Sequence, residues 1–325
     1  MQTNPSAAAR LPNGARATPT PSQPPSSAKR MTLAAVTRGK VVKPPRDLIY
    51  GTSGVGKTTF ACSAPRPIVF QAEEGANNID VARFPKPEGW ADLLDAIDTL
   101  TNERHDYETF VIDTIDALEP MNFRAVCDAG GKKTIAAFSH GAGYIAAIDN
   151  WRAMLVRLEG LIAAKGTRVI LVGHSIIRTF ANPEGADYDK YQLKLNDKAA
   201  GIIVEWCDDV LFAQYETYAV DQEDGKKKAK GVTGSGRVLR TTETATFKAK
   251  NRFALPAEIP LSWEAYAAAI AAGQPDVGAV HEEIARLVAS FSEAGLAEKV
   301  NAAVLSAGGA TETLARIADR LRSKA

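Results

Sequence analysis

The sequence predicts an α/β fold in which helices flank a mostly parallel β-sheet. From residue 46 onward, short apolar runs of strand length alternate with longer segments of helical periodicity. These runs are continuously apolar, which is typical of parallel strands that are buried on both faces. A glycine-rich loop, Gly51–Thr58, follows the first run and opens a helical segment. These observations together favour the α/β class.

Five segments are expected to be strands of the parallel sheet, and two are expected to be helices. The strands are Asp47–Tyr50, Pro67–Phe70, Thr109–Ile112, Arg168–Val172 and Asp209–Gln214. The helices are Trp90–Leu100 and Ile145–Ile162, each with its apolar residues on one stripe. After residue 215 the pattern predicts an antiparallel extension with strands at Tyr215–Val220, Gly236–Thr242 and Thr246–Phe253.

Composition divides the 325 residues into three parts. Residues 1–32 are expected to be a disordered, basic tail rich in Pro, Ser and Ala, because they cannot bury enough apolar surface to fold. Residues 33–270 are expected to form the core, and residues 276–325 a small C-terminal helical module. The chain has 39 basic and 38 acidic residues, but residues 1–46 contain no acidic one, so the remainder is mildly acidic. Nucleic-acid binding would therefore depend on local patches or on the tail.

Cysteine usage and hydropathy restrict the cellular compartment in which the protein is expected. The three cysteines, Cys62, Cys127 and Cys207, are far apart and show neither a metal-ligand nor a disulfide spacing. No apolar run approaches the roughly 18 residues that a membrane-spanning helix requires. We therefore expect a cytoplasmic protein with no membrane partner.

The glycine-rich loop carries the most specific motif of the chain. Gly51–Thr58 (GTSGVGKT) matches the phosphate-binding pattern G-x-x-x-x-G-K-[ST] at every position, whereas the Rossmann pattern G-x-G-x-x-G fails. Backbone N–H groups of such a loop converge on a phosphate, Lys57 would reach the β- and γ-phosphates, and Thr58 would ligate Mg²⁺. The residues expected to bind the nucleotide are Gly51, Thr52, Ser53, Gly54, Val55, Gly56, Lys57, Thr58 and Thr59. The sequence thus predicts a P-loop nucleoside triphosphatase that uses ATP and Mg²⁺.

Polar residues follow three other predicted strands and are candidates for the reaction. Asp113 stands where P-loop enzymes hold the magnesium shell, and it could also cap the next helix. A carboxylate at Glu73 or Glu74 could activate the attacking water, although an exposed acidic turn is the alternative. His174 could sense the γ-phosphate, or it could be a structural histidine.

The order of these motifs resembles a known family. The segments that carry the resemblance are the P-loop, Gln71–Gly75 (QAEEG), Phe110–Thr114 (FVIDT), Ile170–His174 (ILVGH), a long loop Ser175–Lys198, and Lys248–Pro256 (KAKNRFALP). Over residues 33–265 the chain resembles the RecA-like core ATPases of phages, which are minimal RecA/RadA-type proteins of single-strand annealing and recombination. The resemblance implies a RecA-like P-loop fold, with Glu74 preferred as the catalytic base and Glu73 as the alternative. It also implies that Lys250 and Arg252 act on the ATP of a neighbouring subunit, whereas the residues alone favour the solvated face of an edge strand.

The same resemblance implies two DNA-binding segments. The loop Ser175–Lys198 matches the position of a DNA-binding loop of recombinases, and Gly130–Tyr144 is a candidate for a first such loop. The residues expected to contact DNA are Lys132, Lys133, Arg178, Phe180, Lys190, Tyr191 and Lys194. Aromatic rings among cations suit base stacking and phosphate pairing, but an ordinary ordered loop is the alternative for both segments.

The leading hypothesis is an ATP-hydrolysing, DNA-binding protein of phage recombination in a phage-infected or prophage-bearing bacterial cell. It would bind single-stranded DNA for annealing or strand exchange and assemble as a homo-oligomeric ring or filament. A single-stranded DNA-binding protein is a further expected partner. The alternatives are a helicase loader or DNA-motor ATPase subunit and, less favoured, a small-molecule kinase.

Overall fold

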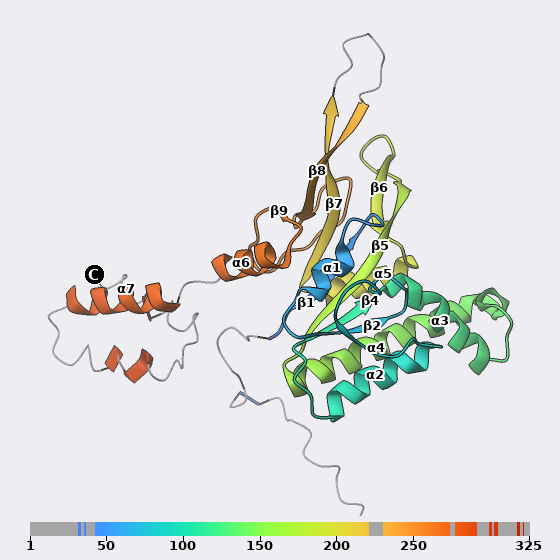
Figure 1. Ribbon diagram of the computed structural model, residues 1–325, viewed down its shortest axis with the longest axis horizontal. Helices are drawn as coiled ribbons and strands as arrows, with labels where there is room; N and C mark the ends of the chain where they lie inside the picture. The colour runs from blue at the N-terminus through green and yellow to red at the C-terminus, as the bar shows by residue number, and fades with distance from the viewer. Residues whose placement is uncertain are drawn as a thin grey trace, which may run out of the picture. The chain divides into compact units, whose positions relative to one another are not determined.

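The computed structural model describes residues 43–220, 230–273 and 277–290, together with the short pieces 32–33, 36, 299–300, 302–304, 317–318 and 321. The chain divides into two units, residues 1–39 and 40–325, and every element labelled in Figure 1 belongs to the second. The predicted tail, residues 1–32, lies outside the described residues apart from Thr32.

In the described residues, one nine-stranded sheet forms the centre of the core (Figure 1). Its strands are β1 (Arg46–Gly51), β2 (Pro67–Gln71), β3 (Ala82–Arg83), β4 (Thr109–Asp113), β5 (Arg168–Phe180), β6 (Tyr188–Leu193), β7 (Asp209–Val220), β8 (Lys230–Arg240) and β9 (Glu258–Pro260). The order is β3-β2-β4-β5-β1-β7-β8-β9, and β6 pairs with β5 outside this path. The strands from β3 to β7 in this order are parallel, whereas β8, β9 and β6 are antiparallel to their neighbours. The predicted fold class, a mostly parallel sheet with an antiparallel extension, is confirmed.

Helices cover both faces of the sheet because successive strand residues point into two different cores. Leu48 and Ile112 belong to one core, with residues of α2, α3, α4 and α5. Ile49 and Val111 belong to the other, with residues of α1 and α6. The helices are α1 (Lys57–Cys62), α2 (Trp90–Asn102), α3 (Ile115–Ala129), α4 (Ala142–Lys165), α5 (Asp197–Trp206), α6 (Trp263–Gly273) and α7 (Val277–Ser290), with short 3₁₀ turns η2 (Ile135–Ala137) and η3 (Ser139–Gly141). This two-sided burial explains the continuously apolar strands.

The parallel strands place the predicted site residues at one edge of the sheet. β1 ends at Gly51 and β4 ends at Asp113, with β5 between them. His174 lies next to Gly51 in the register of β5 against β1, and β2 ends at Gln71 just before the two glutamates. Since all these strands run in the same direction, segments that are distant in the sequence meet at this edge.

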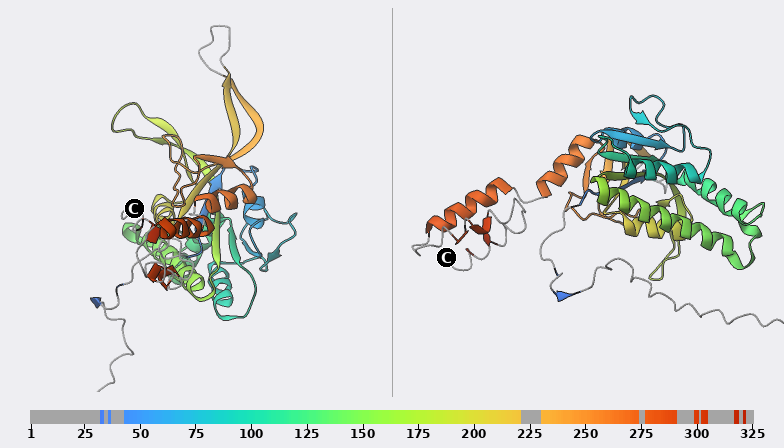
Figure 2. Two further views of the ribbon diagram at one scale, coloured as in Figure 1. Left: turned by 90° about the vertical axis from the view of Figure 1, so that its left-hand side faces the viewer. Right: turned by 90° about the horizontal axis from the view of Figure 1, so that it is seen from below.

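The segment Ser175–Lys198, expected to be a long loop, is largely a β-hairpin. β5 continues beyond His174 to Phe180 and pairs with β6, so the turn is confined to the residues between Phe180 and Tyr188. The sequence carries the signal for this hairpin, because Asn182–Gly185 is a turn-forming stretch between β-branched and aromatic runs. The hairpin and the β7–β8 arm project from the same side of the core (Figure 2).

The antiparallel extension also differs from the prediction in two places. The segment Tyr215–Val220 is the continuation of β7 and not a separate strand. The segment Thr246–Phe253 is not a strand, because in the described residues it makes two isolated bridges and no ladder. The Asn251 side chain bends the chain there by accepting hydrogen bonds from two backbone N–H groups that follow it.

A buried polar network ties α6 to the amino ends of β1 and β7. The Tyr266 hydroxyl lies 2.8 Å from an oxygen of Asp47 and 2.8 Å from an oxygen of Asp209, and all three side chains are fully buried. A hydroxyl has one hydrogen, so it can donate to one carboxylate and must accept from the other. The arrangement is therefore satisfied when one aspartate of the pair carries a proton. Burial raises the pKa of both carboxyls, that of Asp209 to about 6.

Asp209→Asn should stabilise the fold above pH 6. The amide can donate to the Tyr266 oxygen and still accept from the Arg252 N–H, which lies 3.1 Å from Asp209 Oδ1. Since folding raises the pKa of Asp209 from 3.8 to about 6, its contribution to stability is lost as the pH rises through this window. A pKa change of this size corresponds to about 3 kcal/mol, so we expect a gain of about 1–3 kcal/mol at pH 8 and little gain at pH 4.

Urea unfolding at several pH values, with the exposed substitution Asp95→Asn as the control, measures this difference. Equal pH dependence of the wild-type protein and Asp209→Asn would show that the two carboxyls share no proton in the folded state.

The C-terminal part of the chain contains helical pieces that pack on one another. α7 and the described residues after it contribute Ile284, Val300, Ala318 and Leu321 to one small apolar cluster. A helical module at residues 276–325 remains a prediction, since many of its residues lie outside those described. None of the described helices is long and apolar enough to cross a membrane.

Candidate active site

The P-loop connects the end of β1 to α1 and adopts a conformation that requires glycine. Gly54 and Gly56 have φ angles of 75° and 108°, in the region that side chains disfavour. Lys57 is buried at 5% exposure, and its Nζ donates to the carbonyls of Gly51 and Thr52 at 3.2 Å and 2.9 Å. Burial lowers the pKa of Lys57, against the neighbouring Asp113 carboxylate. α1 has six residues, so the dipole of this short helix contributes little at its amino end. Phosphate binding would therefore depend on the amides of the loop and on Lys57.

The structure brings the side-chain oxygens of Thr58 and Asp113 together. Thr58 Oγ1 lies 3.1 Å and 3.0 Å from the two carboxylate oxygens of Asp113. A Cβ at Gly75 would lie 3.1 Å from Asp113 Oδ2 and 3.6 Å from Thr58 Oγ1, so the glycine keeps the space beside these oxygens open. Burial raises the pKa of Asp113 to about 6, against the hydrogen bond from Thr58. A hydroxyl and a carboxylate are the ligands that Mg²⁺ prefers, so these residues fit the metal.

A cavity of about 270 Å³ joins the P-loop to the acidic residues at the strand ends, and Glu73, not Glu74, lines it. The Thr114 hydroxyl donates to Glu73 Oε2 at 2.9 Å and orients the carboxylate. Glu74 instead pairs with Lys86 at 2.9 Å on the surface, which lowers its pKa. Of the two carboxylates only that of Glu73 faces the cavity, so the geometry favours Glu73 over the expected Glu74, and the identity of the base stays a prediction.

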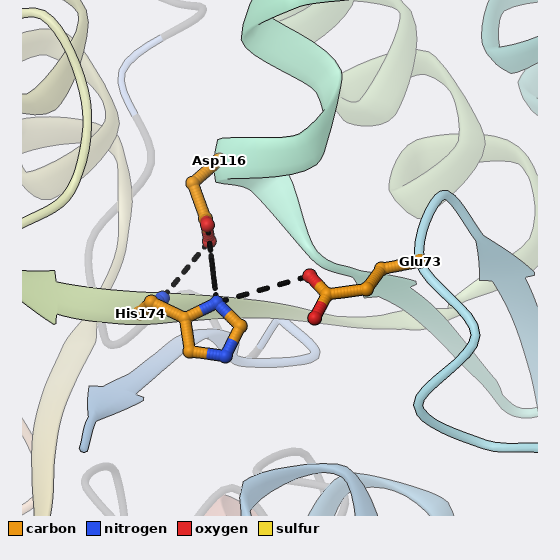
Figure 3. A group of neighbouring side chains, drawn as sticks. All are labelled: Glu73, Asp116 and His174. Carbon is orange, nitrogen blue, oxygen red and sulfur yellow. Dashed lines mark hydrogen bonds and ion pairs between the residues drawn. The ribbon is translucent and has the colours of Figure 1, made fainter. Parts of the chain in front are cut away.

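His174 is held between α3 and the loop after β2 (Figure 3). Its Nδ1 lies 3.0 Å from Asp116 Oδ2 and 3.8 Å from Glu73 Oε2, and its backbone N–H donates to Asp116 Oδ1 at 2.9 Å. Burial alone would raise the pKa of Asp116, but the hydrogen bonds from His174 hold it below its usual value. An ionised Asp116 accepts the proton of Nδ1, so Nε2 on the other side of the ring is available to a ligand.

Comparison with known proteins identifies the family. Residues 43–253, more than half of the chain, match the family model AAA_24, described as an AAA domain. The chain belongs to this AAA-domain family. Its members are P-loop ATPases, in agreement with the geometry of the loop after β1.

The AAA domain is also similar to a phage-derived protein and to a recombinase structure. The chain is 29% identical to the SPbeta prophage-derived uncharacterized protein YorG of Bacillus subtilis strain 168 over 100 residues. These residues are 30% of this chain and 29% of that protein. The chain thus matches less than a third of the length of this relative. The crystal structure of the RadB recombinase aligns at 14% identity with a TM-score of 0.38, over 68% of this chain and 89% of that one.

Lys250 and Arg252 lie away from the P-loop of the AAA domain. Lys250 forms a bridge with Val210 near the start of β7, whereas the P-loop follows the opposite end of β1. Lys250 Nζ donates to three carbonyls at the carboxyl end of α5, and the Arg252 guanidinium pairs with Asp208 at 2.8 Å. Both cations thus stabilise this chain's own fold, and their action on a neighbouring ATP stays a prediction.

The predicted DNA-binding residues divide into those that face solvent and those that are engaged. Lys132 and Lys133 are exposed in the turn after α3, and Lys194 is exposed beside the site. The other four, on the β5–β6 hairpin, have partners: Arg178 pairs with Asp197, Lys190 with Glu243, Phe180 packs on Tyr188, and Tyr191 packs on Phe212. Tyr191 is turned toward the protein, whereas Lys190 shares a face with Phe180, its Nζ 5.8 Å from the centre of the ring, and Phe180 is 37% exposed. DNA contact by any of them stays a prediction.

Asp116 and Thr114 are the site residues that sequence reasoning did not assign. Both lie at the start of α3, directly after the strand that ends in Asp113. Their position in a first helical turn resembles ordinary capping, so their partners emerge only when β2 and β5 are placed beside β4.

Proposed function

We propose that this AAA domain binds and hydrolyses ATP with Mg²⁺, and that its nucleotide state controls binding of single-stranded DNA. The observation that carries the proposal is the single cavity lined by Lys57, Thr58, Asp113, Glu73 and His174. These residues supply a phosphate-binding cation, two metal ligands, a base and a hydrogen-bonding group. A cavity that only bound phosphate would not need the base or the hydrogen-bonding group.

Binding of ATP would use the amides of the P-loop and the ammonium group of Lys57, both directed at the phosphates. Thr58 and Asp113 would hold Mg²⁺, which supplies positive charge to the phosphates when it is bound. The hydrogen bond between Thr58 and Asp113 already brings both oxygens to one place, so little reorganisation is required.

Hydrolysis would use Glu73 as the general base. Its carboxylate faces the cavity, and the hydrogen bond from Thr114 limits its rotation. A base in this position takes a proton from the attacking water and typically contributes 10²- to 10⁴-fold in rate. His174, fixed through Nδ1 by Asp116, would present Nε2 to the γ-phosphate side of the cavity.

His174 also belongs to the root of the β5–β6 hairpin, and this supports a link to DNA. Its carbonyl accepts a hydrogen bond from the Lys194 N–H at 2.9 Å, and Lys194 Nζ lies 3.7 Å from Asp116. A shift of His174 on loss of the γ-phosphate would therefore reach the hairpin through two contacts. Phe180, an aromatic ring on the hairpin with 37% exposure, is suited to stacking on a base.

The proposal is tested on the full-length protein by two measurements. ATP hydrolysis is measured with and without oligo(dT), and fluorescence anisotropy of labelled oligo(dT) is measured with ATP, with a non-hydrolysable analogue and without nucleotide, at low salt. We expect the analogue to tighten DNA binding at least about tenfold, which corresponds to a coupling of about 1.4 kcal/mol. Particle mass with ATP tests the ring or filament that we propose for the assembly.

Each outcome distinguishes the alternatives. DNA binding that is indifferent to nucleotide overturns the DNA part of the proposal and leaves the ATPase part standing. A helicase loader or motor subunit would require a partner protein for its activity, and a small-molecule kinase would act as a monomer without any effect of DNA.

A further inference from the structure

Two side chains of the β7–β8 arm contact consecutive carbonyls of the P-loop. The Tyr215 hydroxyl donates to the Gly54 carbonyl at 3.0 Å. The Arg237 guanidinium donates through Nη1 to the Val55 carbonyl at 3.2 Å. Neither residue belongs to the P-loop motif, and neither lines the cavity described above. Both contacts come from the antiparallel extension.

The sheet explains why both side chains reach the same loop. β7 runs parallel to β1 as far as the pair of Ala213 with Gly51, and Tyr215 lies two residues further on the same face. Tyr215 and Arg237 are directly opposite one another in the β7–β8 ladder. The register shifts immediately afterwards, between Tyr215 and Thr217, so this is the last regular rung on the side of the arm next to the site.

The contacted atoms decide how the loop presents its amides. In a phosphate-binding loop the N–H groups point inward, so the carbonyls of the same peptide units point outward and need other partners. Hydrogen bonds to two outward carbonyls fix the planes of two neighbouring peptide units. Arg237 also covers the loop closely, because a Cβ at Gly56 would lie 2.7 Å from its Nη1.

We propose that Tyr215 and Arg237 are positioning residues that hold the P-loop in its nucleotide-binding conformation from outside. This inference rests on the proposed binding of ATP at the loop. It also connects the arm to the nucleotide, because movement of β7 against β8 at this rung must move the carbonyls of Gly54 and Val55. Tyr215 and Arg237 thus affect the affinity for nucleotide and leave the step carried out by Glu73 unchanged.

The test is a titration of the full-length protein with a fluorescent ATP analogue and Mg²⁺. Tyr215→Phe removes only the hydroxyl, and Arg237→Ala removes the guanidinium. We expect each to weaken the analogue about fivefold and the double variant at least about 25-fold, the size expected when single hydrogen bonds are lost. The KM for ATP should rise by the same factors, with kcat within about twofold of the wild type, which is the pattern of a lost binding interaction.

The controls separate this inference from the proposed function and from unfolding. Arg152→Ala removes an exposed arginine that pairs with Asp149 on α4 and should leave nucleotide affinity unchanged. If the wild-type protein does not bind the analogue, the proposed function fails. If the wild-type protein binds but Tyr215→Phe and Arg237→Ala bind equally well, or if kcat falls in place of the rise in KM, the positioning role is overturned. Tyr215→Phe keeps the aromatic ring, so it decides the matter even if Arg237→Ala unfolds.

Discussion

Glu73→Gln should lower ATP hydrolysis at least about 100-fold while ATP binding stays within about threefold of the wild type. The amide keeps the size of the side chain and can still accept the hydrogen bond that Thr114 donates at 2.9 Å, so the cavity should retain its shape. It cannot take a proton from water, because an amide has no basic oxygen. Steady-state hydrolysis and a binding titration on the same preparation measure the two effects separately.

Glu74→Gln provides a matched control on the neighbouring residue. Glu74 is 69% exposed and pairs with Lys86 outside the cavity, so this variant should hydrolyse ATP at the wild-type rate. A large loss in Glu74→Gln with normal activity in Glu73→Gln would reverse the assignment of the base. Equal losses in both would indicate that the loop after β2 moves as a unit when nucleotide binds.

Much of the fold could be predicted from the sequence because its strongest signals are local. Continuously apolar runs identify β1, β2 and β4 to within one or two residues, since burial on both faces of a sheet favours apolar residues at the central positions of each strand. The P-loop is equally local, because its positive φ angles require glycine at Gly54 and Gly56. The extent of β5 is harder to predict, because most side chains of the hairpin Ser175–Leu193 are polar or partly exposed and few of them, such as Leu193, are buried.

The choice between Glu73 and Glu74 depends on tertiary contacts that cannot be predicted from the local sequence. Adjacent residues point in different directions, and the direction is decided by partners far along the chain. Thr114 lies at the start of α3, whereas Lys86 lies in the segment between β3 and α2. The sequence offers two candidates for the base, and the packing of β2 against β4 brings only Glu73 to the cavity.

Lys250 and Arg252 show the opposite case. The resemblance implies that they act on ATP, but the fold does not place them near the P-loop of this chain. Their partners are the carboxyl end of α5 and Asp208, at the amino ends of the strands. A basic residue that caps a helix and one that reaches a phosphate can stand in the same alternating sequence pattern, so the pattern does not distinguish the two roles. The distinction requires the position of the segment relative to β1 and β7.

Lys57→Ala should weaken ATP binding at least about 100-fold, because it removes a buried ammonium group whose hydrogen bonds to charged phosphates are each worth about 1.5–3 kcal/mol. In the structure its Nζ contacts the carbonyls of Gly51 and Thr52, and it is the one cation that lines the cavity of the described residues together with Thr58 and Asp113. Calorimetric titration with ATP and Mg²⁺ measures the loss. The nucleotide-dependent part of oligo(dT) binding should disappear with it.

The stability of Lys57→Ala separates a binding defect from a folding defect. Burial already lowers the pKa of Lys57, so its charge is held at a cost in the folded protein, and its removal should change the midpoint of thermal unfolding by no more than a few degrees. Lys86→Ala, which removes an exposed lysine 2.9 Å from Glu74, should bind ATP normally. Wild-type affinity in Lys57→Ala would place the nucleotide outside the P-loop, and unchanged nucleotide-stimulated DNA binding would mean that DNA responds to some group other than this loop.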